Sequence, residues 1–395
     1  MTSHNLTAPN AITRILALLF LLFTTTQAAY AAPKKSFAEE LDVLGANFSE
    51  YMNQQDFVAV LNLFDTQQLA SSVSDQLELT GKFRKDFETG MLQSLNSPQW
   101  LRNFLQQGTP TFISKGARKI DGKYRAIVRI DYETGGHNFL ELQCKRNQAG
   151  ELKIVDFFIA TTGQNVVATL VDTSALLLKQ QSGVVAKLIA AYQGEENLQQ
   201  KIKQINELRS QGKFAEAHNI LQSLPDSVRD SEIIVSMSIM LSSNISDELY
   251  RADLNRLAKL YGDKPRFSFM LIDHYFYEED FTNALKATGI MQKRYGTDAA
   301  LLNLQGRLLH LDGKGKKGNK ALEAAIKAEP YTIDAYWSLM EFYAADKQFQ
   351  LAVDTMSRME NQFDYTFSTD DFDTSDPTMA SLVNSDAFKQ KVGTP

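Results

Sequence analysis

The stretch HLDGKGKKGNK, residues 310–320, contains the residue types that come nearest to a nucleotide site. Gly313, Gly315 and Gly318 have the spacing of a dinucleotide fingerprint, which needs a β-strand directly before it. The preceding residues, LLNLQGRLLHLD, instead have a helical hydrophobic period. A phosphate-binding P-loop needs lysine and then serine or threonine after its last glycine, whereas Asn-Lys follows here. We therefore interpret these glycines as a turn between helices and a close helix contact, and we expect no nucleotide cofactor.

Other residues with catalytic or metal-binding chemistry are scattered. The four histidines beyond residue 31 form no i, i+4 pair of the kind that binds zinc on a helix: His137, His218, His274 and His310. Cys144 alternates with Leu140 and Leu142, which predicts a core position rather than a nucleophile. The acids between 370 and 376 lack the glycine and final glutamate of a calcium loop. We expect no metal, no cofactor and no enzymatic activity.

The N-terminus has the order of an export signal. Arg14 precedes the apolar run from Ile15 to Phe23, and small residues follow as far as Ala31. The run is about half of the roughly 20 residues that cross a bilayer. Residues 1–31 are therefore predicted to be a cleaved signal peptide. We expect a soluble mature protein, either periplasmic or otherwise secreted, with no membrane span.

Length, charge and cysteine content narrow the possibilities further. A chain of 395 residues predicts two domains, because one hydrophobic core rarely organises so many. The formal net charge of −6 argues against nucleic acid as the main partner. A single cysteine allows no internal disulfide. None of these features indicates an oligomeric state.

The first domain, residues 32–172, has an α+β pattern. Helical periodicity from Ser36 to about Gln107 gives way to alternation between Thr111 and Thr162, with two-residue turns at Asp121-Gly122 and Gly135-Gly136. This order predicts helices followed by a four-stranded antiparallel meander with one covered face. Six basic residues surround the first turn, and they could serve solubility on the open face or contact an anionic partner: Lys115, Arg118, Lys119, Lys123, Arg125 and Arg129.

Residues 36–170 resemble the nuclear-transport-factor-like or cystatin-like superfamily in their element order and in the strand VDFFI. In that superfamily a curved sheet wraps a helix and can enclose a pocket, into which a polar residue points. Asp156 is the matching position, so the resemblance implies a possible pocket residue or a catalytic acid there. The simpler alternative is that Asp156 lies at an edge or pairs with a neighbouring cation.

Residues 173–365 repeat with a constant period. KLYGDK begins at position 259 and KRYGTD at 293, and the small residues Ala284, Gly318 and Ala352 have the same spacing. This period of about 34 residues resembles the tetratricopeptide repeat (TPR), in which two antiparallel helices form each unit and a small residue permits their close contact. The resemblance implies an all-α solenoid. Tyr250 departs from it, because the family has a small residue at that position, so that unit is degenerate or shifted.

The TPR register also implies the residues of a concave groove, because the first helix of each unit lines the inner surface. The implied groove residues are Phe269, Asp273, Phe276, Asn303, Arg307, His310, Trp337 and Glu341. The aromatic members could equally pack against neighbouring repeats or the first domain. Residues 366–395 are expected to form an acidic C-terminal tail with a short helix.

Two functions follow from these expectations. The first is a non-catalytic scaffold or adaptor outside the cytoplasm that binds a protein or peptide in the solenoid groove. The alternative is a binding protein for a small apolar ligand, which the first domain would enclose. An enzyme acting through Asp156 is the third and least supported hypothesis.

Overall fold

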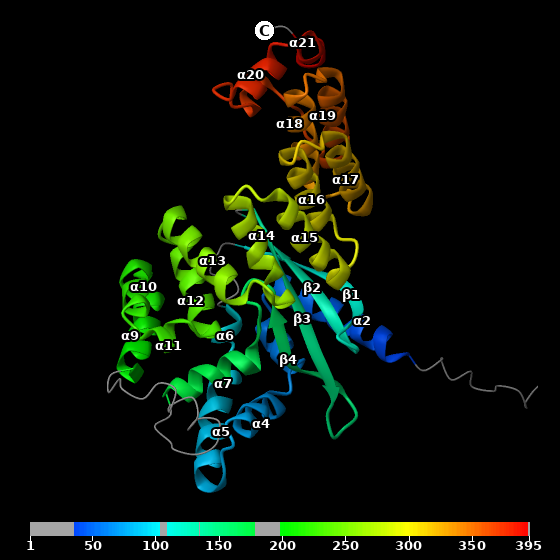
Figure 1. The fold of residues 1–395 in the computed structure, drawn as a ribbon. Helices are drawn as coiled ribbons and strands as arrows, with labels where there is room; N and C mark the ends of the chain where they lie inside the picture. Colours follow the sequence, from blue (N-terminus) through cyan, green and yellow to red (C-terminus); the bar gives the residue numbers. More distant parts are fainter. Residues whose placement is uncertain (1–34, 103–108, 134, 178–197, 394–395) are drawn as a thin grey trace, which may run out of the picture.

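The computed structural model describes residues 35–102, 109–133, 135–177 and 198–393. An α+β region comes first and an all-helical region follows it, as the sequence predicts (Figure 1). The predicted signal peptide, residues 1–31, lies outside the described residues. Within the described residues, no helix combines the length and apolar character that crossing a membrane requires.

Among the described residues, five helices precede the sheet: α2 (Phe37–Asn53), α3 (Phe57–Asn62), α4 (Thr66–Gln76), α5 (Gly81–Leu95) and α6 (Gln99–Arg102). Polar residues cap several of their first turns. Ser36 and Glu39 form a capping box at the start of α2, and Asp56 and Asp65 accept backbone N–H groups at the starts of α3 and α4. These caps explain why the helices begin where they do.

The sheet is antiparallel and its strands follow chain order: β1 (Thr111–Ile120), β2 (Lys123–Asp131), β3 (His137–Arg146), β4 (Leu152–Ile159) and β5 (Gln164–Asn165). The predicted meander is therefore present, with a fifth strand in addition. That strand consists of two residues, which pair with Phe158 and Ile159. Two residues are too few to produce a detectable alternation, so the sequence pattern could not predict it.

Both faces of the sheet are covered, so the prediction of one covered face is wrong. On one face, Ala126, Val128 and Ile130 of β2 pack with residues of α2 and α3. On the opposite face, Ile127 of β2 and Phe139 of β3 share a hydrophobic core with the helical region. The prediction failed because Arg125, Arg129 and Asp131 made the second face look solvated, although Ile127 lies between the charges on that face.

The described part of the helical region contains five helical hairpins: α9 (Leu198–Ser210) with α10 (Phe214–Gln222), α12 (Glu232–Ser242) with α13 (Asp247–Tyr261), α14 (Ser268–Tyr277) with α15 (Phe281–Tyr295), α16 (Ala299–Leu311) with α17 (Gly315–Ala328), and α18 (Ile333–Ala345) with α19 (Phe349–Phe363). Two short elements connect neighbouring hairpins: α11 (Asp226–Arg229) and the 3-10 helix η2 (Pro265–Phe267).

The repeat period is visible in the helix boundaries. Helices α13, α15, α17 and α19 begin at Asp247, Phe281, Gly315 and Phe349, which are evenly spaced by one period. The unit that contains Tyr250 is therefore not shifted. The glycines of the opening motif also have the predicted structural roles, since Gly313 forms the turn between α16 and α17 with a φ of 71°.

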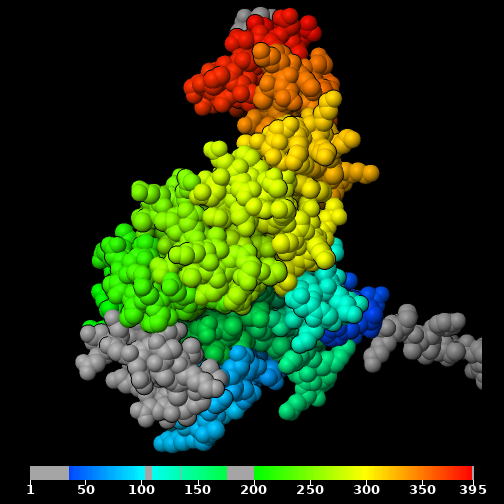
Figure 2. Space-filling model, viewed as in Figure 1, coloured from blue at the N-terminus to red at the C-terminus, as the bar shows by residue number. Residues whose placement is uncertain are grey.

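The sheet and the helical region pack directly against each other. The predicted boundary at 172/173 falls inside α7 (Val166–Leu177), which packs against β4 and α4. Hydrophobic side chains of α15 and α16 then lie against the sheet, including Met291 and Leu301. Figure 1 shows α14 and α15 beside the strands, and Figure 2 shows the later hairpins standing away from them.

The C-terminal segment is folded against the last hairpin rather than extended as a tail. It contains a 3-10 helix η3 (Thr369–Asp371) and two short helices, α20 (Pro377–Val383) and α21 (Asp386–Val392), where one was predicted. Phe367, Phe372 and Phe388 are buried in the same core as α18 and α19. The acidic residues nearby favoured the prediction of a tail. The burial of these aromatic side chains instead holds the segment against the last hairpin.

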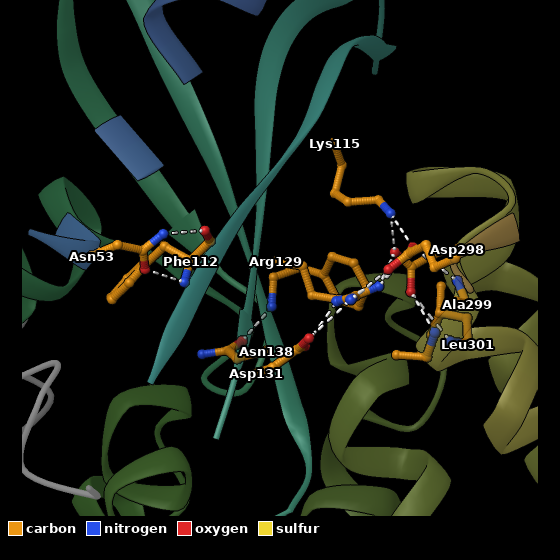
Figure 3. A network of polar contacts seen from close by, with 12 residues as sticks. Asn53, Phe112, Lys115, Arg129, Asp131, Asn138, Asp298, Ala299 and Leu301 are labelled. Atoms are coloured by element: carbon orange, nitrogen blue, oxygen red, sulfur yellow. Dashed lines mark hydrogen bonds and ion pairs between the residues drawn. The ribbon is translucent and has the colours of Figure 1, made fainter. Parts of the chain in front are cut away.

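The outer edge of β1 is protected by side chains of α2. The Asn53 amide donates to the carbonyl of Phe112 at 2.9 Å and accepts its N–H at 2.8 Å, which copies the bonding of a neighbouring strand (Figure 3). Asp42 accepts the N–H of Ala117 further along the same strand. These contacts leave fewer free backbone groups for edge-to-edge association.

Candidate partner-binding groove

A buried ion-pair network joins the sheet to the helical region. Arg129 on β2 donates to Asp298 at 2.7 Å and to Glu329 at 2.8 Å, and it also pairs with Asp131 on its own strand. Lys115 on β1 contacts the same two helical-region carboxylates, at 2.9 Å in the case of Asp298 (Figure 3). The Asp298 side chain is fully buried, so its charge depends on these two cations.

Asp298 also begins helix α16. Its Oδ1 atom accepts the N–H groups of Ala300 and Leu301, while Oδ2 accepts from Arg129 and Lys115. One carboxylate therefore caps the helix and anchors it to the sheet. This double role fixes where the first turn of α16 lies relative to strand β2.

A second polar contact strengthens the same junction. Glu141 on β3 accepts from the Arg294 guanidinium at 3.0 Å and from the Tyr295 hydroxyl at 2.9 Å. The Tyr295 ring stacks on Phe139 with centroids 4.4 Å apart. The sheet and α15 are thus held together by ion pairing, hydrogen bonding and ring stacking at one place.

Beside this junction lies a groove of about 1100 Å³ between the sheet and the hairpins. The end of β2, the turn after it and the start of β3 form one wall. Helices α14 and α16 and the connection from α17 to α18 form the other. Tyr331 in that connection leaves 76% of its surface exposed, and Ile333 is also exposed. The groove therefore offers apolar surface as well as charge.

Four of the eight predicted groove residues line this groove: Phe269, Asp273, Asn303 and Arg307. Phe269 and Asp273 lie one turn apart on α14, and Asn303 and Arg307 occupy the corresponding positions on α16, one repeat later. One Asp273 oxygen accepts the Tyr250 hydroxyl at 2.7 Å. The structure thus brings together two matching pairs from neighbouring hairpins.

The other four predicted residues lie outside the groove lining. Phe276 is exposed and packs edge-on against Phe281. His310 stacks on Phe342 with centroids 3.7 Å apart. Trp337 is covered by Phe367 and Phe372 of the C-terminal segment, and Glu341 is exposed to solvent. The sequence register could not predict that the last hairpin is covered by the chain itself.

Two polar atoms in the groove are buried without a hydrogen-bond partner among the described residues: Oδ1 of Asn303 and Nε2 of His137. Only 9% of Asn303 is exposed. The His137 ring contacts Phe269 and Phe139 edge-on, and both His137 and Asn303 belong to the groove lining. A buried polar atom without a partner costs about 1–3 kcal/mol, so a ligand that supplied the partners would recover that energy.

Asp156, the predicted pocket residue, caps a helix. It accepts the N–H of Val167 in the first turn of α7 at 3.0 Å and that of Phe157 at 2.8 Å. Burial raises the pKa of its carboxyl, although these two hydrogen bonds act in the opposite direction. Asp156 lies outside the groove lining. Its contacts give it a structural role that needs no ligand.

Aromatic rings pack together on the sheet face that α2 and α3 cover. Phe64 packs edge to face against Phe48, Trp100 and Phe157, with centroids 5.2–6.4 Å apart. Phe112 adds a further edge contact with Phe48. These rings belong to the hydrophobic core between the sheet and the N-terminal helices.

A second cavity of about 540 Å³ lies where the turn before α7, α12 and η2 meet the sheet. Its charges are largely paired with one another. Glu232 pairs with Lys264 and Arg266, and Arg294 pairs with Glu141 as described above. The charged groups of this cavity therefore gain less from a ligand than those of the groove.

Nucleophilic and metal chemistry finds little support in these contacts. Burial raises the pKa of the Cys144 thiol to about 12, so the reactive thiolate is scarce near neutral pH. In the part of the chain that the structure describes, no three His, Cys, Asp or Glu side chains are grouped so that they could hold a metal ion.

Sequence reasoning missed the sheet side of the groove and the acids that anchor it. The sequence places Arg129 and Lys115 in a basic stretch with no identified acidic partner, it offers His137 only as a metal ligand that lacks a second histidine, and it gives no signal for Asp298 or Glu329. One signal in the sequence could have identified Arg129 as a buried, paired residue. Ile127 lies next to Arg129 in the alternation, which indicates that the second face of the strand is buried and that its arginine has a partner.

Comparison with known proteins finds no relative of this chain. No protein-family model matches the sequence, and no curated protein and no solved structure matches it significantly. The functional argument therefore rests on the geometry of this chain.

The pKa values of His137 and Glu329, which line the groove, predict that these residues contribute less stability in acid. Burial lowers the pKa of His137 to about 4, so the unfolded chain, with an ordinary value of 6.5, binds more protons between pH 6.5 and 4. Burial alone would raise the pKa of Glu329, but hydrogen bonds from Arg129 and Lys115 lower it from 4.5 to about 2. These two groups should lower the free energy of unfolding through both windows as the pH drops, whereas burial raises the pKa of Asp131 and Asp273, which act in the opposite direction.

Urea unfolding at a series of pH values tests this expectation. Between pH 6.5 and 4, the free energy of unfolding of His137→Phe should fall by about 1–2 kcal/mol less than that of the wild-type protein. The reason is that the variant no longer takes up that proton on unfolding. Below pH 4 the two curves should run in parallel. Identical slopes between pH 6.5 and 4 would show that His137 is not buried as described.

Proposed function

We propose that this protein is a non-catalytic scaffold that binds a protein or peptide partner in the groove between its sheet and its helical hairpins. The observation that carries the proposal is the groove itself. It has a volume of about 1100 Å³, and its walls are formed by two regions that a buried ion-pair network joins. A preformed groove loses little conformational entropy when it binds an extended partner.

The lining suits a peptide better than a compact metabolite. Apolar and aromatic side chains such as Phe269, Leu304 and Tyr331 lie among charged groups on the helical wall, and Ile113 and Tyr132 do so on the sheet wall. Protein interfaces use aromatic and arginine side chains as anchors, and Phe269 and Arg307 offer both kinds. Helical hairpins in a row commonly present such surfaces to extended segments.

We assign the hairpins to the TPR architecture within this proposal. Support comes from the constant spacing of α13, α15, α17 and α19 and from small residues where paired helices touch. The proposed compartment is the periplasm or the extracellular space, on the basis of the signal-like residues 1–31. A partner in that compartment would meet the groove after export.

Photo-cross-linking in native extract tests the proposal. A photoreactive amino acid at position 307 should give a discrete adduct with a protein or peptide, because Arg307 lines the groove and its side chain is exposed. Glu341 provides a matched control position. It is also exposed and occupies the equivalent position of the next repeat, on α18 and outside the groove.

A further inference from the structure

The charges of the groove are predominantly acidic. Among the described residues, five carboxylates line it, against two guanidinium groups: Asp131, Glu133, Asp273, Glu329 and Asp334, with Arg129 and Arg307. Arg129 is already paired with three carboxylates. Glu133, Asp273 and Asp334 are exposed. A surface with this balance attracts cationic side chains and repels anionic ones.

The unpartnered oxygen of Asn303 calls for a hydrogen-bond donor. A carboxamide oxygen such as Oδ1 of Asn303 can only accept. The low pKa of His137, about 4, keeps its ring neutral at pH 7, so the ring carries no charge that would repel a cation. Lysine and arginine side chains carry several N–H donors and no acceptor, which makes them complementary to such atoms.

Phe269 and Asp273 complete the recognition chemistry. Phe269 lies against His137 and lines the groove, and an aromatic ring attracts a cation near its face. Asp273 lies one turn further along α14 and supplies a carboxylate, of which one oxygen is taken by Tyr250. The ring, the carboxylate and the Asn303 oxygen come from adjacent first helices of two hairpins.

We propose that Phe269, Asp273 and Asn303 form a subsite for a lysine or arginine side chain of an extended peptide partner. This inference rests on the proposed function and specifies the chemistry of its ligand. The basic side chain places its N–H groups against Asn303 and Asp273 and its aliphatic stem along Phe269. The rest of the peptide follows the groove toward Tyr331.

The test uses immobilised full-length mature protein and four pools of peptides. Each pool has a fixed central residue, Lys, Arg, Gln or Glu, and the same randomised flanking positions. Mass spectrometry measures the amount of each pool that the protein retains. The Lys and Arg pools should be retained at least about tenfold more than the Gln pool, a difference of about 1.4 kcal/mol, and the Glu pool least of all.

Two matched pairs of variants locate the effect. Asp273→Asn should reduce the Lys-over-Gln preference at least about threefold, whereas Glu341→Gln, which removes a carboxylate on the next hairpin outside the groove, should leave it unchanged. Asn303→Leu should also reduce the preference without loss of stability, because its oxygen has no hydrogen bond within the described residues.

The outcomes separate this inference from the proposed function. Equal retention of the Lys, Gln and Glu pools, a preference for Glu, or no retention of any pool would overturn the basic-side-chain subsite. A discrete adduct from position 307 would still support groove binding in each of these cases. If position 307 gives no adduct and no pool is retained, the groove hypothesis itself fails.

Discussion

Arg129→Ala is expected to reduce the free energy of unfolding by about 3–5 kcal/mol, the largest effect of any single substitution considered for this protein. The Arg129 side chain is 3% exposed and pairs with Asp131, Asp298 and Glu329. Its removal leaves the fully buried carboxylate of Asp298 with Lys115 as its one remaining cationic partner within the described residues. An uncompensated buried charge is much more costly than a lost surface ion pair.

The measurement is urea unfolding followed by tryptophan fluorescence. The chain has two tryptophans, Trp100 in the sheet region and Trp337 in the last hairpin, so single-tryptophan variants report on each region separately. The two transitions should coincide in the parent protein because the regions share a core. In Arg129→Ala they should move apart, as the docking of hairpins on the sheet weakens.

Arg358 provides the control for this substitution. It makes a two-pronged contact with Glu323 at 2.8 and 2.9 Å, but both side chains are more than 40% exposed. Arg358→Ala should therefore cost less than about 1 kcal/mol. Equal losses for Arg129→Ala and Arg358→Ala would contradict the buried network at the junction.

Gly318→Ala is expected to destabilise the protein by about 1–3 kcal/mol, although alanine normally strengthens a helix. A Cβ atom at Gly318 would lie 2.8 Å from the backbone oxygen of Gly306 and 2.4 Å from the His310 ring. The backbone oxygen cannot move without separating α16 from α17. The close contact therefore outweighs the gain in helix propensity.

Gly289 in the neighbouring hairpin makes the sign of the effect testable. It also lies within a helix, α15, but apart from its chain neighbours and the nearby backbone of its own helix, no atom of the described residues lies within 4 Å of the place where its Cβ would be. Gly289→Ala should stabilise the protein by about 0.5–1 kcal/mol. Thermal and urea unfolding of both variants decide the matter. If both substitutions stabilise, the helices α16 and α17 do not cross as closely as described.

Much of the fold could be predicted because local patterns determine it. The regular spacing of small residues located the paired helices α14 to α19, and the turns Asp121-Gly122 and Gly135-Gly136 located the meander. What failed depended on contacts between distant segments. The second covered face of the sheet arises from packing against α15 and α16, and no local period records that association.

The candidate site was only half predictable for the same reason. Phe269, Asp273, Asn303 and Arg307 follow from the repeat register, because equivalent positions of successive first helices face one side. His137 and Arg129 reach the groove only through the docking of the sheet. Trp337 was predicted from the repeat register to face a partner. Phe367 and Phe372 of the same chain cover it instead.

The photo-cross-link from position 307 tests the central claim most directly. Three positions should be compared in the same native extract: 307 in the groove, 341 on the next hairpin, and 58 on α3, where Val58 is 68% exposed on the far side of the sheet. We predict a discrete adduct from 307 and none from 341 or 58. Equal yields from 307 and 341, or an adduct from 58 alone, would contradict the groove as the binding site.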